Sequence, residues 1–118
     1  MPTQHQPTQL DQMFHALADA NRRAMIDSLS HADRSVSELR APLGISMPAT
    51  MQHLGILETA GLVKTRKHGR VRTCTLDTMA LSRAEQWINQ RREFWSNRLD
   101  ELGKFLTTYA TNAESEQK

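Results

Sequence analysis

Cysteine and aromatic residues are scarce in this sequence. Cys74 is the single thiol among 118 residues, so the chain cannot form an internal disulfide or an all-cysteine metal site. Aromatic residues make up 5% of the chain, and we therefore expect a core of Leu, Ile, Val, Met and Ala. No apolar run approaches the ~20 residues of a membrane span, and the polar start at residues 1–7 lacks the layout of a signal peptide. These absences predict a cytoplasmic chain with no membrane partner.

The sequence also lacks the motifs of catalysis. It has no Gly-rich phosphate loop and no nucleophile elbow. Its five histidines share no spacing with carboxylates that indicates a catalytic or metal cluster. At 118 residues the chain is long enough for one modest domain. We therefore expect a protein that is not an enzyme and that holds no cofactor and no metal.

Positive charge is concentrated in one short segment. Residues 62–76 contain five Lys and Arg residues and no acid, whereas residues 1–61 contain four Lys and Arg residues against six acids. Clustering of this kind is the electrostatic footprint of a nucleic-acid binder. The alternative is a solvated basic hairpin without a partner. The segment that precedes it in the sequence favours nucleic-acid binding over this alternative.

Hydrophobic spacing predicts a series of helices in the first half of the chain. Apolar residues at helical intervals indicate helices over 8–18 and 20–30, and Asp19 between them suits an N-cap. After a loop, a short helix ends near residue 43, with either Ser35 or Ser37 as its cap.

A longer helix follows a tight turn at residues 44–45. Ser46 is its predicted N-cap, Pro48 fits its first turn, and Gly61 stops it just after residue 59. A short helix, a Gly-containing turn and a longer helix form the helix-turn-helix arrangement.

The basic segment reads as a β-hairpin. Residues 62–67 and 70–76 are rich in Val and Thr and flank the turn at His68 and Gly69. A basic hairpin directly behind a helix-turn-helix is a wing. The predicted fold class is mainly α with a small β-hairpin, a winged helix-turn-helix spanning residues 9–81.

A last helix is predicted over residues 82–109. At about 40 Å it is longer than a domain of this size covers, and one face is broadly apolar and carries both tryptophans. A second subunit is the best cover for that face, which makes this the dimerisation helix. Residues 1–8 are expected to be a disordered tail and residues 110–118 a flexible one. The dimer contacts expected on this helix are Trp87, Phe94, Trp95, Leu102 and Phe105.

Three blocks in order resemble the ArsR-type repressors. Residues 16–26 (ALADANRRAMI) look like the family's opening, and residues 45–54 (ISMPATMQHL), followed by Leu57-Glu58 and 60–63 (AGLV), look like its recognition helix. Residues 66–70 (RKHGR) resemble its wing. The resemblance covers about residues 10–80 and implies a homodimer held by its first and last helices, with Leu10 and Phe14 contributing from the first. It also implies repression by occupying operator DNA.

The sequence departs from the family's metal sensors. Where many members have Cys-Val-Cys, this chain has Ser35-Val36-Ser37, and it has no histidine after His68, where other members bind zinc on the last helix. Thiolate and imidazole are the ligands that such metals need. No metal site is therefore predicted, and the inducer stays unknown.

DNA-facing positions follow from the inward turn of Leu54 and Leu57. Recognition helices read bases from their N-terminal half, which gives Ser46, Met47, Ala49, Thr50, Gln52 and His53. His53 has a structural role as an equal alternative, and Met51 is favoured as core filling. In the wing, Lys67 and Arg70 are expected to meet phosphates or enter the minor groove, with Arg66 and Arg72 as supporting charge. A dimer places two recognition helices roughly 34 Å apart, which predicts an inverted-repeat operator.

Two other functions are kept open. The first is a thiol-based redox-sensing repressor, since arginines beside Cys74 would lower the pKa of its thiol; the alternation of the strand favours burial instead. The second is a winged-helix adaptor that binds protein rather than DNA, and the concentration of cations in the wing argues against it.

Overall fold

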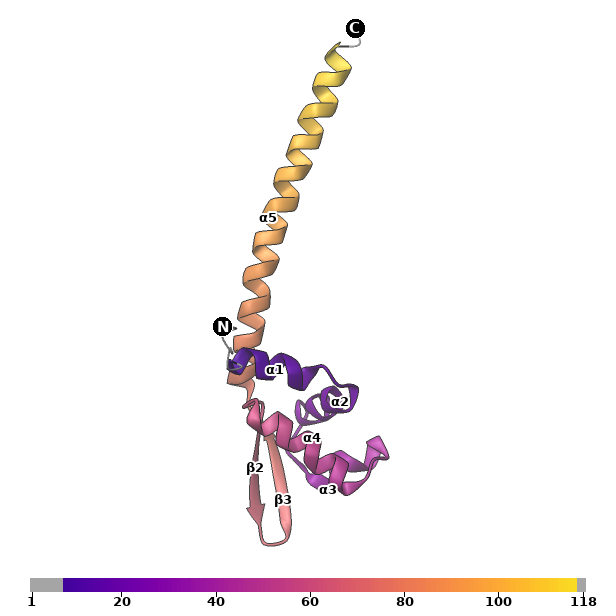
Figure 1. The fold of residues 1–118 in the computed structure, drawn as a ribbon, viewed down its shortest axis with the longest axis vertical. Helices are drawn as coiled ribbons and strands as arrows, with labels where there is room; N and C mark the ends of the chain where they lie inside the picture. The colour runs from indigo at the N-terminus through magenta and orange to yellow at the C-terminus, as the bar shows by residue number, and fades with distance from the viewer. Residues whose placement is uncertain (1–7, 117–118) are drawn as a thin grey trace, which may run out of the picture. The chain divides into compact units, whose positions relative to one another are not determined.

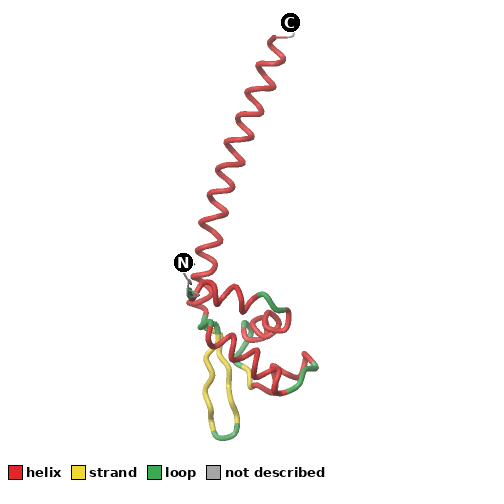
Figure 2. The backbone as a smooth tube through the Cα atoms, viewed as in Figure 1, coloured by secondary structure: helices red, strands yellow, loops and turns green. Residues whose placement is uncertain are grey.

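The computed structural model describes residues 8–116 of the chain (Figure 1). The chain divides into two units, residues 1–84 and 85–118, which we describe separately. Figure 2 shows the helices and strands of the first unit. They are α1 (Gln9–Leu17), α2 (Ala20–Leu29), β1 (Arg34–Ser35), α3 (Val36–Arg40), a 3-10 turn η1 (Ala41–Leu43), α4 (Met47–Thr59), β2 (Val63–His68) and β3 (Val71–Leu76). The last helix, α5 (Thr78–Glu116), begins in the first unit and forms the second.

Helix α1 begins with a capping box. The Thr8 hydroxyl accepts a hydrogen bond from the backbone N–H of Asp11 at 3.2 Å, and the Asp11 carboxylate accepts one from the N–H of Thr8 at 2.9 Å. Two backbone donors that the helix itself leaves unpaired are thereby satisfied. Thr8 is the N-cap of α1 and is held by this box, so the predicted tail over residues 1–8 is too long by one position; residues 1–7 lie outside the described part.

Side-chain caps fix the starts of three more helices. Asp19 accepts from the N–H of Arg22 at 3.1 Å and Ser46 accepts from that of Ala49 at 3.2 Å, as predicted. Of the two serines proposed for α3, Ser35 is the cap, and it forms a reciprocal box with Glu38. At the other end of α4, Gly61 adopts φ +76°, a left-handed conformation that ends the helix and that favours glycine.

The hairpin of β2 and β3 is part of a three-stranded antiparallel sheet, ordered β1-β3-β2. The turn between β2 and β3 contains Gly69 at φ +60°. Strand β1 is absent from the sequence-based prediction, which ends a loop at Arg34 and offers Ser35 as a helix cap, because two residues are too short to show a period. It forms by pairing Arg34 with Cys74 and Ser35 with Thr73, and it anchors the hairpin to the start of α3.

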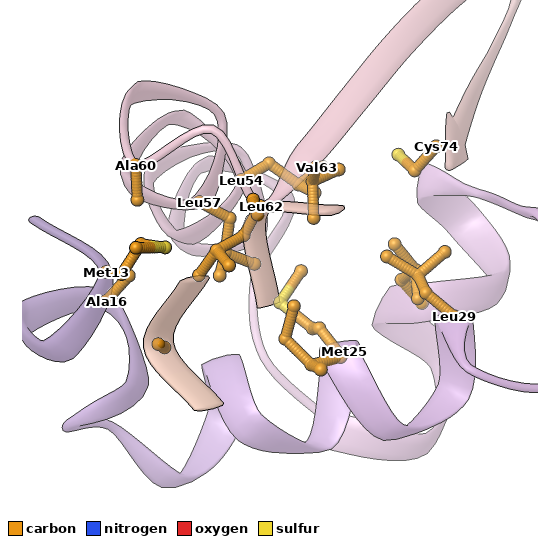
Figure 3. Close-up of a cluster of buried hydrophobic side chains, with 14 of the residues drawn as sticks. Met13, Ala16, Met25, Leu29, Leu54, Leu57, Ala60, Leu62, Val63 and Cys74 are labelled. Atoms are coloured by element: carbon orange, nitrogen blue, oxygen red, sulfur yellow. The ribbon is translucent and has the colours of Figure 1, made fainter. Parts of the chain in front are cut away.

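The core lies among α1, α2, α4 and the base of the hairpin (Figure 3). Leu54, Leu57 and Leu62 are fully buried there, and Met25 and Met13 are 1% exposed. Burying a side chain of this size contributes about 1.5–3 kcal/mol. The inner stripe of α4 is therefore fixed by the core, and the core decides which of its residues face outward.

Helix α5 is longer at both ends than predicted. It begins at Thr78 rather than at residue 82, because the Asp77 carboxylate accepts from the N–H groups of Met79 and Ala80 at 3.0 and 3.3 Å. It continues to Glu116, so residues 110–116 are helical rather than a flexible tail. No Gly or Pro follows residue 103 to stop it. Within the described residues, no helical stretch combines the length and hydropathy of a bilayer span.

Candidate nucleic-acid interface

The N-terminal half of α4 presents part of the predicted reading surface. Ser46, Met47 and Gln52 are exposed, and Ala49 is half-buried. Met51 is half-buried and packs against the core, as favoured from the sequence. The helix dipole favours an anion at the start of α4, although Pro48 has no N–H and the N–H of Ala49 already donates to Ser46. Four of the six predicted positions therefore remain available to DNA.

Thr50 does not belong to that surface. Its side chain is fully buried, and its hydroxyl donates a hydrogen bond to the carbonyl oxygen of Ser46 at 2.8 Å. A hydroxyl that bonds to the preceding turn satisfies itself within the helix. The prediction that Thr50 faces DNA was wrong because position 50 lies on the same side of α4 as Leu54 and Leu57.

His53 takes the structural role that the sequence left open. Its side chain is 17% exposed, and its Nδ1 lies 3.2 Å from Nη1 of Arg22 and 4.0 Å from Oδ1 of Asp19. A guanidinium can only donate, so Nδ1 is the acceptor in the contact with Arg22. His53 thus joins α4 to the turn between α1 and α2.

Arg22 is a buried cation at the end of α1. Arg22 is 8% exposed. Its Nε donates a hydrogen bond to the carbonyl oxygen of Ala16 at 2.6 Å, and its Nη2 donates one to the carbonyl oxygen of His15 at 3.2 Å. The last carbonyls of a helix have no intrahelical partner, and Arg22 supplies one. Arg23 does the same at the surface, donating to Leu17 O at 2.7 Å. Both arginines therefore have structural roles, each donating to carbonyl oxygens at the end of α1.

The wing, which we define as residues 63–76, has two faces. Cross-strand pairing sets Lys67 opposite Arg72, and Thr65 opposite Cys74. Because side chains alternate along a strand, Lys67 and Arg72 lie on the face that also carries the buried Cys74. That face and the start of α4 enclose a groove of about 370 Å³. The groove is lined by Lys67, Arg70, Val71 and Arg72 from the wing, Met47 and Met51 from α4, and residues 35–37.

The other face of the wing carries a second set of cations. Arg66 pairs with Thr73 and Lys64 with Thr75, and together with His68 and Asp33 they line a groove of about 290 Å³. Lys64 is not among the wing residues predicted from the sequence. Strand alternation alone would have placed it with Arg66, although Asp77, 3.7 Å from its Nζ, already pairs with it. Of the four predicted wing residues, Arg66, Lys67 and Arg70 are exposed and Arg72 is half-buried.

The chain is similar in sequence and in structure to known transcriptional regulators. Residues 17–66 match the sequence model of a helix-turn-helix domain family. The transcriptional regulator Rv2034 of Mycobacterium tuberculosis is 37% identical over 106 residues, covering 90% of this chain and 90% of that protein. The crystal structure of the ArsR family regulator RHA00566 superposes with a TM-score of 0.72 at 39% identity, covering 75% of this chain and 98% of that one. The chain belongs to the ArsR family of transcriptional regulators.

Membership of the ArsR family indicates the general function of the chain. Helix-turn-helix regulators of this family bind DNA and are typically dimeric, and they are not enzymes. The transcriptional repressor SdpR of Bacillus subtilis is 27% identical over 79 residues, covering 67% of this chain and 88% of that protein. The predicted fold class, mainly α with a small β-hairpin in a winged helix-turn-helix, is confirmed by these structural neighbours.

The two positions where the resemblance would place metal-binding thiolates are Ser35 and Ser37 in this chain. Ser35 is engaged as the cap of α3 and Ser37 is exposed at its start. Hydroxyls are poor ligands for the soft and borderline metals that thiolates hold. Among the described residues, no three His, Cys, Asp or Glu side chains come together as a metal site.

Cys74 is a core residue of the sheet. It is fully buried, and desolvation raises the pKa of its thiol to about 11, assisted by the carboxylate of Glu58 and opposed by Arg72. The thiolate is the reactive form of cysteine, and here it is suppressed. The geometry therefore disfavours the thiol-based sensor that the sequence left open.

Proposed function

We propose that this protein is a sequence-specific DNA-binding repressor that binds an inverted-repeat operator as a homodimer. The observation that carries the proposal is the groove between the wing and the start of α4, where Lys67 and Arg72 face each other beside Met47. A repressor of this kind acts beside the chromosome, so we place it in the cytoplasm.

The positive charge on the face of the wing that carries Cys74 favours the binding of an anion. Lys67 and Arg72 are direct cross-strand partners, and side chains in such pairs are about 5 Å apart at Cβ. Like charges at that distance destabilise a hairpin unless something neutralises them. Phosphate does so, since DNA offers one negative charge per ~1.7 Å of duplex. Arg70 at the tip of the wing extends the same basic edge.

The start of α4 supplies the groups that would read bases. Gln52 is exposed and has an amide that bonds adenine bidentately, while Met47 and Ala49 offer apolar contacts to a thymine methyl. The hydroxyl of Ser46 is used as a cap, so it does not read a base. Ser46 instead lies at the positive end of the helix, which favours a phosphate. Reading of A·T pairs by Gln52 is the specific form of the proposal.

The second unit supplies the proposed dimer surface. Residues 85–116 form one helix whose large apolar side chains are widely exposed, among them Phe94 at 58%, Trp95 at 63%, Leu102 at 52% and Phe105 at 66%. An apolar surface of this kind favours association. Trp87 at 40% and Phe14 at 37% remain predicted contacts of the same dimer, while Leu10 also packs against the core of its own subunit.

Selection from a random DNA pool tests the proposal. The full-length protein should enrich two copies of one half-site, inverted and about one helical turn apart. Gln52→Ala should relax the preference at an A·T position, and the control Glu58→Ala, on the same helix outside the groove, should enrich the wild-type sequence. Failure to enrich any sequence would contradict the regulator and favour the protein-binding adaptor instead.

A further inference from the structure

A third groove lies between α1 and α4, away from the wing. Its volume is about 660 Å³, within the range of small-molecule sites. Gln12 and His15 line it from α1, and Gln52, Gly55 and Ile56 line it from α4. All of these residues belong to the first unit, and none has a place in the interface described above except Gln52.

Gly55 keeps this groove open. It lies in the middle of α4, where glycine weakens a helix relative to alanine. Its φ is not positive, and a Cβ built on it meets no atom within 4 Å. By contrast, a Cβ on Gly61 would come within 2.9 Å of Gln9. Neither the backbone nor packing within the chain thus requires glycine at position 55, and its effect is to leave free space.

The lining defines the chemistry of an occupant. The surface of the groove is mainly apolar, and Ile56 is the one large aliphatic residue that lines it. Within residues 8–116, no hydrogen bond engages the side chains of Gln12, His15 or Gln52. Asp11 is the one acid on the rim, and no Lys or Arg lines the groove. An anionic ligand would find no counter-charge here, whereas an uncharged or weakly basic one would find several hydrogen-bonding partners.

The geometry points to a binding site for a small organic effector, mainly apolar, uncharged or weakly basic, and bearing a hydrogen-bond donor. The effector would regulate the proposed DNA binding, and in this respect the inference rests on that function. Gln52 links the two sites, because the same exposed amide lines the groove and is a proposed base reader. An effector that engages Gln52 competes with DNA for it, and such coupling is reciprocal.

A fluorescent probe of this chemistry tests the site without DNA. N-phenyl-1-naphthylamine is an uncharged aromatic amine that fluoresces in apolar surroundings. It should bind the full-length wild-type protein saturably, and Gly55→Leu, which fills the groove, should weaken binding by at least about tenfold. Gly103→Leu is the matched control: it is the other helical glycine with open space at its Cβ, and it lies outside the groove. This variant should bind the probe like wild type.

Three results would overturn the site. The first is the absence of saturable probe binding, and the second is equal probe affinity in wild type and Gly55→Leu. The third is a smaller sedimenting species for Gly55→Leu than for wild type, because this would show that the groove is a contact between subunits. Circular dichroism should show that Gly55→Leu is folded, since its side chain enters open space.

Binding to the selected operator tests the coupling separately. Saturating probe should weaken DNA affinity about fivefold or more in wild type and leave Gly55→Leu unaffected. Unchanged DNA affinity in wild type would overturn the regulatory part of the inference. Probe binding without any DNA binding would instead contradict the proposed function while the site stands.

Discussion

Nη1 of Arg22 lies 3.2 Å from Nδ1 of His53, although 31 positions separate the two residues in the sequence. The contact joins the recognition helix α4 to the end of α1, because Arg22 also binds the carbonyls of Ala16 and His15. One buried guanidinium thereby sets the position of α4 against the helices behind it. The orientation of the reading surface depends on this contact.

Removing Arg22 should destabilise the fold. Arg22→Ala loses three hydrogen bonds of a charged group, and we expect a loss of about 2–4 kcal/mol in the free energy of unfolding, measured by urea titration. Arg23→Ala is the control, since this exposed side chain makes a single bond to Leu17 O; it should cost less than about 1 kcal/mol. Equal losses of unfolding free energy in the two variants would show that the buried contacts of Arg22 stabilise the fold no more than the exposed bond of Arg23.

Cys74 should be inert in the folded protein. Burial raises its pKa to about 11, so at pH 8 the thiolate is a minor species, and the thiol-reactive reagent also lacks access. Labelling with Ellman's reagent should be about 100-fold slower than for free cysteine and should become fast in denaturant. Fast labelling of the native protein, together with loss of DNA binding, would revive the redox sensor.

Acid should weaken the helix caps. Hydrogen bonds from the backbone N–H groups of Arg22 and Ser35 lower the pKa values of Asp19 and Glu38 below their ordinary values of 3.8 and 4.5. Their contribution to stability is therefore present above those ordinary values and is lost as the pH falls through the lower values of the folded state. Asp19→Asn still caps α2 but does not titrate. Urea unfolding at pH 7 and pH 3 should show a smaller acid loss for Asp19→Asn than for wild type, and parallel losses would contradict this.

The apolar face of α5 should hold the dimer. Leu102→Glu places a charge on that face, and we expect the dimer to dissociate about 100-fold more readily, as measured by sedimentation over a concentration series. Asn97→Glu introduces the same charge about 140° away around the helix and should leave dimerisation unchanged. A wild-type protein that sediments as a monomer at all concentrations would refute the dimer itself.

Local signals in the sequence were sufficient for the framework of this fold. Asp19 and Ser46 bond the first turns of their helices, and Gly61 has the positive φ that ends α4. Each of these roles depends on neighbours within a few residues, and so the sequence shows them. The alternation that predicted burial of Cys74 is equally local and was right.

Other features depended on partners distant in the sequence. Strand β1 exists because Arg34 and Ser35 pair with β3, some 40 positions away. Thr50 was expected to face DNA, yet it lies on the core side of α4. The contact of Arg22 with His53 and the groove at Gly55 both arise only when α1 packs beside α4. These relations are tertiary, and no spacing within one element encodes them.

The salt dependence of operator binding tests the central claim most directly. If phosphates are held between Lys67 and Arg72, the logarithm of the association constant should fall linearly with the logarithm of salt concentration. Lys67→Gln and Arg72→Gln should each reduce that slope by about one unit, while Lys104→Gln, on α5, should leave it unchanged. Equal slopes in wild type and both wing variants, or binding that does not respond to salt, would contradict the account.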